Sequence, residues 1–159
     1  SENQKATVRC KSQHKERLSK LFDMTRFGRE GMKQELRLLV DGEYTYMNPG
    51  ISALALGMMM AFNKEQPVVW NTYQCYLSAT LDNITKDLAV AETAGCCFGA
   101  KIVRGAYLEK ERKLALDQGY PDPINPTYEA TGQMYDHVVD FMTEHISIPF
   151  LLFCHLFFL

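Results

Sequence analysis

The chain has 159 residues, which suffices for one domain, and its 47% apolar and 23% charged composition excludes a wholly disordered protein. Seventeen Lys and Arg against 19 Asp and Glu give a net charge of −2. A near-neutral chain has no global positive field to hold nucleic acid or an acidic membrane.

Cysteine and histidine spacing gives no sign of a metal centre. The five cysteines contain no C-x-x-C pair, which favours free thiols in a reducing compartment. The four histidines show neither H-x-x-x-H nor H-E-x-x-H spacing, so we expect no metal site.

The predicted elements alternate along the chain. Amphipathic patterns over residues 14–33 and 77–91 predict helices, the second with its apolar face on Leu77, Leu81, Ile84, Leu88 and Ala91. Asn48 is the expected N-cap of a helix over 51–62, a charged helix follows at 108–118, and Asn125-Pro126 is expected to open another. Short runs rich in branched residues predict buried strands at 37–41, 68–73 and 100–105, with a further strand near the end of the chain.

The predicted strands begin at residues 37, 68 and 100, so they repeat every 31 or 32 residues. Strands alternating with helices predict a parallel α/β sheet, and this spacing suits both a (β/α)8 barrel and a doubly wound sheet. The absence of G-x-G-x-x-G and G-x-x-x-x-G-K-[ST] argues against the nucleotide-binding doubly wound folds.

Polar side chains follow the strands, where parallel α/β folds place their sites. They are Asp41, Glu43, Asn71, Tyr73, Gln74, Lys101, Arg104 and Tyr107. A charge in a buried strand needs a ligand or a structural partner, for example Asp41 paired with Arg104 on a neighbouring strand. The aromatic residues nearby either line a planar cofactor or pack the core, and their pattern favours packing; they are Tyr44, Tyr46, Trp70, Tyr73 and Tyr76.

Four segments in order resemble the proline dehydrogenase family of the mitochondrial type: LLVDGEYTY (38–46), WNTYQCYL (70–77), FGAKIVRGAYLEKER (98–112) and DPINPTYEAT (122–131). The resemblance covers about residues 30–145. It implies a partial (β/α)8 barrel in which the three strands correspond to strands two to four. It also implies FAD, oxidation of L-proline to Δ1-pyrroline-5-carboxylate, ubiquinone as electron acceptor, and the matrix side of the mitochondrial inner membrane.

The resemblance also implies roles for individual residues. Asp41 would organise the charged substrate pocket, and Lys101 would stand beside the flavin N5, where a positive charge stabilises reduced flavin. Tyr107 would pack near the substrate ring. The expected FAD contacts are Gly42, Asn71, which would face the isoalloxazine, and Val103, Arg104 and Gly105.

Parts of the family pattern are missing. The strand-one lysine and the paired arginines that hold the substrate carboxylate have no counterpart, and His155 matches the strand-five histidine without its following Asn. We therefore expect a helical segment at 1–35, a partial barrel at 36–146, and an aberrant apolar tail at 147–159 that is too short to span a bilayer. Residues 1–30 show no targeting peptide, so we expect any such segment to lie outside this sequence.

A partial barrel exposes sheet edges, so we expect this chain alone to be aggregation-prone and inactive. Two other functions stay open. One is hydroxyproline dehydrogenase, a close relative. The other is a non-catalytic truncated isoform whose open sheet edge or apolar tail pairs with a partner.

Overall fold

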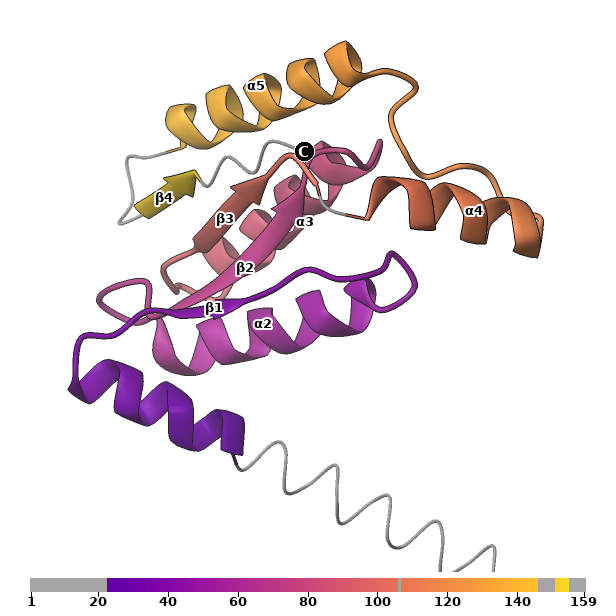
Figure 1. The fold of residues 1–159 in the computed structure, drawn as a ribbon. Helices are drawn as coiled ribbons and strands as arrows, with labels where there is room; N and C mark the ends of the chain where they lie inside the picture. The colour runs from indigo at the N-terminus through magenta and orange to yellow at the C-terminus, as the bar shows by residue number, and fades with distance from the viewer. Residues whose placement is uncertain (1–22, 106, 146–150, 155–159) are drawn as a thin grey trace, which may run out of the picture.

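The computed structural model describes residues 23–105, 107–145 and 151–154 (Figure 1). A helix over residues 23–33 precedes alternating strands and helices. These are β1 (Leu38–Val40), α2 (Asn48–Phe62), β2 (Val69–Gln74), α3 (Thr80–Thr93), β3 (Gly99–Val103), α4 (Leu108–Gln118), α5 (Tyr128–Glu144) and β4 (Leu151–Cys154). The predicted alternation is confirmed, including the further strand late in the chain.

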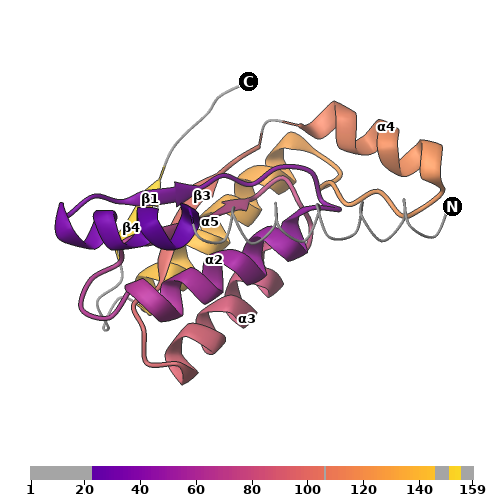
Figure 2. The ribbon, with the colours of Figure 1, turned by 90° about the horizontal axis from the view of Figure 1, so that it is seen from below.

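The four strands form one parallel sheet in chain order, β1-β2-β3-β4. Figures 1 and 2 show α2, α3 and α5 side by side on one face of this sheet, whereas α4 lies beyond the carboxyl ends of the strands. Strands in sequential order with helices on a single face are the arrangement of a βα barrel, since a doubly wound sheet carries helices on both faces.

The main core lies between the sheet and these three helices. Ile84 and Leu88 of α3, Val138 and Met142 of α5, and Ile102 of β3 are buried there. The apolar face predicted for the helix at 77–91 is therefore confirmed. Trp70, Tyr73 and Tyr76 are also buried, as the packing interpretation of the aromatic residues requires.

The prediction of Asn48 as an N-cap is wrong, and the helix expected to open at Asn125-Pro126 begins slightly later, at Tyr128. Helix α2 begins at Asn48 itself, with no side-chain cap, because the Asn48 side chain bonds to Gln74 and to the Glu43 backbone instead. Helix α5 begins at Tyr128, where the Thr127 hydroxyl accepts from the Ala130 N–H. The Asn125 amide donates to the Cys75 carbonyl, so both asparagines serve long-range contacts.

Three sequence predictions fall partly or wholly beyond this region. Residues 14–22 of the first predicted helix, most of the segment 147–159, and His155 lie outside the described residues. Among the helices that the structure does describe, none combines the length and the apolar character that a membrane crossing requires.

Candidate active site

A cleft of about 340 Å³ opens at the carboxyl edge of the sheet, where the sequence predicted a site. It is bounded by the segments that follow β1 and β3 and by the end of β2. Its lining residues are Asp41, Gly42, Glu43, Thr72, Gln74, Lys101, Val103, Gly105 and Tyr107. The structure thus brings together six residues to which the family resemblance gave a role: Asp41, Gly42, Lys101, Val103, Gly105 and Tyr107.

Lys101 and Asp41 form an ion pair across the width of β2. The Lys101 Nζ lies 2.7 Å from Asp41 Oδ1, and the lysine side chain is 14% exposed whereas the aspartate is 75% exposed. The partner of Asp41 is therefore Lys101, and the predicted pairing with Arg104 is wrong. Because the aspartate is largely in water, the pair contributes little to stability and leaves a charged ammonium on the cleft wall.

Side chains of β2 alternate between the cleft and the helices. Thr72 is in register with Lys101, and paired residues of parallel strands point to the same face, so Thr72 and Gln74 face the cleft. Asn71 lies on the opposite face, where its Nδ2 donates to Ser52 Oγ of α2 at 3.0 Å. The amide that reaches the cleft is that of Gln74 rather than that of Asn71.

Tyr73 shares the helix-facing side with Asn71. Its hydroxyl donates to Asp87 Oδ2 of α3 at 2.8 Å. Burial, together with the negative charge of Asp87, raises the pKa of Tyr73, and burial also raises the pKa of Asp87. This pair fastens α3 to the sheet and stands apart from the cleft.

Gln74 is held by a small hydrogen-bond network. Its Oε1 accepts from Asn48 Nδ2 at 2.8 Å, and its Nε2 donates to the Glu43 carbonyl at 3.0 Å. The Glu43 N–H in turn donates to Asn48 Oδ1 at 3.2 Å. The network fixes the segment after β1 against the end of β2. Sequence reasoning missed Asn48, because its Asn-Pro context resembles an ordinary helix start.

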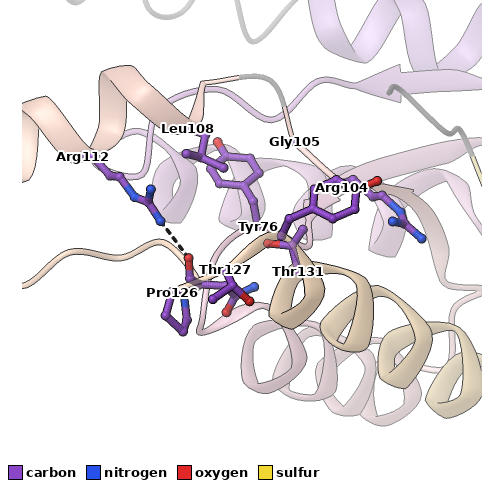
Figure 3. Close-up of a pocket in the computed structure, with 10 residues that line it drawn as sticks. Tyr76, Arg104, Gly105, Leu108, Arg112, Pro126, Thr127 and Thr131 are labelled. Carbon is purple, nitrogen blue, oxygen red and sulfur yellow. Dashed lines mark hydrogen bonds between the residues drawn. The ribbon is translucent and has the colours of Figure 1, made fainter. Parts of the chain in front are cut away.

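Arg104 belongs to a different pocket, of about 290 Å³, between β3, α4 and α5. Figure 3 shows Arg112 reaching from α4 toward Pro126 and Thr127, while Arg104 lies at the other end beside Thr131. The Arg104 guanidinium stacks 5.0 Å from the ring centre of Tyr135 on α5. Its side chain therefore points away from the cleft, although its neighbours Val103 and Gly105 line it.

Two glycines leave the cleft wall without side chains. At Gly105, where φ is +146°, an added Cβ would lie 1.7 Å from Tyr76 Cδ1, so no other residue fits. At Gly42 a Cβ would meet Gln74 Cδ at 3.0 Å. Between them, the buried Thr72 Oγ1 has no hydrogen-bond partner among the described residues. Bare backbone, an unsatisfied hydroxyl and a lysine ammonium together suit a planar ligand that carries hydrogen-bonding atoms and accepts negative charge.

The family model for proline dehydrogenase matches residues 1–154. The chain belongs to the proline dehydrogenase family. It is 54% identical over 112 residues to human mitochondrial proline dehydrogenase 1, an alignment that covers 70% of this chain and 19% of that protein. It is 45% identical over 124 residues to hydroxyproline dehydrogenase of Xenopus laevis, covering 78% of this chain and 27% of the relative. The chain thus spans about a fifth to a quarter of these relatives.

Solved structures of this family share the fold. Proline utilization A from Bdellovibrio bacteriovorus superposes with a TM-score of 0.70 at 19% identity, covering 80% of this chain and 13% of that one. Its proline dehydrogenase domain is a TIM-type barrel, so the sheet described here is part of such a barrel. The predicted fold class is confirmed, and the doubly wound alternative is excluded.

Proline dehydrogenases are flavoenzymes in general. The cleft residues fit that group, because Lys101, the unpartnered Thr72 hydroxyl and the bare Gly42 and Gly105 meet the requirements of a flat, electron-accepting ring. Within the described residues no cluster of three His, Cys, Asp or Glu side chains is placed to bind a metal ion.

Proposed function

We propose that this chain forms part of an FAD-dependent enzyme that oxidises L-proline to Δ1-pyrroline-5-carboxylate in the mitochondrion, with ubiquinone as the electron acceptor. The observation that carries the proposal is the Lys101 ammonium in a cleft at the carboxyl edge of a proline dehydrogenase barrel. The relatives that are named mitochondrial proline dehydrogenases support the substrate and the location.

FAD, if bound in this cleft, would supply a two-electron acceptor for the hydride of the proline ring carbon next to nitrogen, and loss of a proton from that nitrogen would complete the C=N bond. Lys101 would supply a fixed positive charge where negative charge develops, and Asp41 would hold that ammonium in place. Gly42, Val103 and Gly105 would form the wall against the cofactor. Tyr107 would exclude water beside the substrate ring.

This proposal gives no FAD contact to the side chains of Asn71 and Arg104, which the family resemblance assigned to FAD. Gln74 and Thr72 take the polar contacts that the resemblance gave to Asn71, because only the former two line the cleft. The Arg104 side chain is assigned to the packing of α5, through Tyr135. The division into residues 1–35, 36–146 and 147–159 stays a prediction.

Substrate choice between the two close enzyme types is tested by anaerobic titration of the FAD-loaded full-length enzyme of which this chain forms part, because the partial barrel alone is expected to be inactive. The higher identity to proline dehydrogenase, 54% against 45%, favours L-proline. We expect L-proline to bleach the visible flavin absorbance at least about tenfold faster than trans-4-hydroxy-L-proline. Faster bleaching by hydroxyproline would instead assign the chain to a hydroxyproline dehydrogenase. Bleaching by neither substrate would contradict the proposal.

A further inference from the structure

Glu111 is a buried acid in the first turn of α4, outside the residues that line the cleft. Its exposure is 0%, and no ion pair to it exists among the described residues. Its carboxylate accepts two hydrogen bonds from a single residue: Oε1 from the Thr45 N–H at 2.6 Å and Oε2 from the Thr45 hydroxyl at 2.7 Å. Both oxygens of the acid are thus committed to Thr45.

Thr45 lies in the β1–α2 loop, residues 41–47, which carries Asp41, Gly42 and Glu43 into the cleft. The first half of this loop is fixed by the network of Gln74 and Asn48 at Glu43. The second half is fixed by Glu111. The loop is therefore clamped at two points, and the second clamp comes from a helix 66 residues further along the chain.

Glu111 also lies close to aromatic residues near the cleft. The ring of Tyr44, next to Thr45, lies 5.1 Å from that of Tyr107, whose carbonyl accepts from the Glu111 N–H. The Tyr76 hydroxyl is buried without a partner among the described residues, and burial, followed by the charge of Glu111, raises the pKa of Tyr76. Thr45, Tyr44 and Tyr107 are thus connected to the start of α4 by the Glu111 hydrogen bonds and the Tyr44–Tyr107 ring contact.

A buried carboxylate without a cation is costly, and an apolar residue would pack the same space at lower cost. What an apolar residue cannot supply is a pair of acceptors for the Thr45 N–H and hydroxyl. We propose that Glu111 is a positioning residue that, through Thr45, sets the β1–α2 loop and with it the Asp41–Lys101 pair and the Tyr44–Tyr107 contact. The proposal rests on the proposed function for the meaning of that geometry.

Three variants separate positioning from bulk stability. In Glu111→Gln the amide oxygen accepts from the Thr45 N–H and the amide nitrogen donates to the hydroxyl oxygen, so the clamp survives without charge. Glu111→Leu removes both acceptors at similar volume, and Thr45→Val removes the hydroxyl alone. The control is Glu109→Leu, an exposed glutamate in the first turn of the same helix.

The readouts are amide hydrogen exchange over residues 41–47 and the dissociation constant for FAD, measured on the whole chain. We expect Glu111→Leu to speed loop exchange by about tenfold or more while β2 and β3 keep their protection, and to weaken FAD binding by a similar factor. Thr45→Val should shift both readouts in the same direction, whereas Glu111→Gln and Glu109→Leu should match the unmodified chain.

Unchanged loop exchange in Glu111→Leu and Thr45→Val, or equal loosening in Glu109→Leu, would overturn the proposal. If Glu111→Leu fails to fold, the loop exchange and FAD affinity of Thr45→Val decide whether the proposal holds. Failure of the proposed function looks different: the unmodified chain would not bind FAD, while loop exchange would still respond to Glu111 and confirm the clamp.

Discussion

At the scale of single residues, Gly105 is the position in the cleft wall where we expect a substitution to be tolerated least. Replacement by Ala sets a Cβ 1.7 Å from the Tyr76 ring and requires a side chain at φ +146°. We expect Gly105→Ala to lower the free energy of unfolding by about 3 kcal/mol or more, because overpacking and backbone strain add. Denaturant unfolding followed through Trp70 fluorescence measures this loss.

Gly57 provides the matched control. It lies in the middle of α2, and an added Cβ meets nothing within 4 Å. Gly57→Ala is expected to raise stability by about 0.5–1 kcal/mol, because Ala restricts the unfolded chain and favours helix. Equal effects of the two substitutions would show that the close approach of Gly105 to Tyr76 does not affect the free energy of unfolding.

The sequence predicted which residues gather at the strand ends, but not which face each one takes. Asp41, Lys101 and Gly105 line the cleft, as their motif positions suggest. Asn71 and Gln74 are both amides near the end of β2. Because they are three positions apart along the strand, their side chains point to opposite faces of the sheet. Only the register with β3, which aligns Thr72 with Lys101, decides that Gln74 faces the cleft.

At the scale of elements, Asn63 joins the end of α2 to the beginnings of two strands. Its buried Nδ2 donates to the carbonyls of Val69 and Cys97, and its Oδ1 accepts from the N–H groups of Val68 and Val69. The sequence predicted that the helix ends at residue 62, which is confirmed, and Asn63 is its C-cap. The other contacts are long-range and leave no local sequence signal, as with Asn48 and Asn125.

Loss of the Asn63 side chain should be severe. Asn63→Ala leaves buried carbonyl and N–H groups without partners, each costing about 1–3 kcal/mol, so we expect a loss of at least about 3 kcal/mol. Thermal unfolding of Asn63→Ala beside Asn83→Ala, an exposed position on α3, measures the difference. A shift in melting temperature no larger than that of the control would contradict the role of Asn63 as a link between elements.

At the scale of the whole molecule, the 31–32-residue repeat predicted a parallel sheet, and the one-sided placement of α2, α3 and α5 distinguishes barrel from doubly wound sheet. Spacing cannot make that choice, because it carries no information on which face each helix covers. The face opposite the helices carries the cleft and, on β1, Leu39, which is 46% exposed. An apolar residue on that face suits a barrel interior, and the predicted tendency to aggregate follows from the same exposure.

The central claim is that the cleft binds a flavin beside Lys101. The dissociation constant for FAD, from quenching of flavin fluorescence, tests it most directly in the unmodified chain, in Lys101→Met, and in Lys86→Met, an exposed lysine on α3. We predict equal binding by the unmodified chain and Lys86→Met and binding weaker by about tenfold or more in Lys101→Met, which corresponds to about 1.4 kcal/mol. Absence of binding, or the same affinity in all three proteins, would contradict this account.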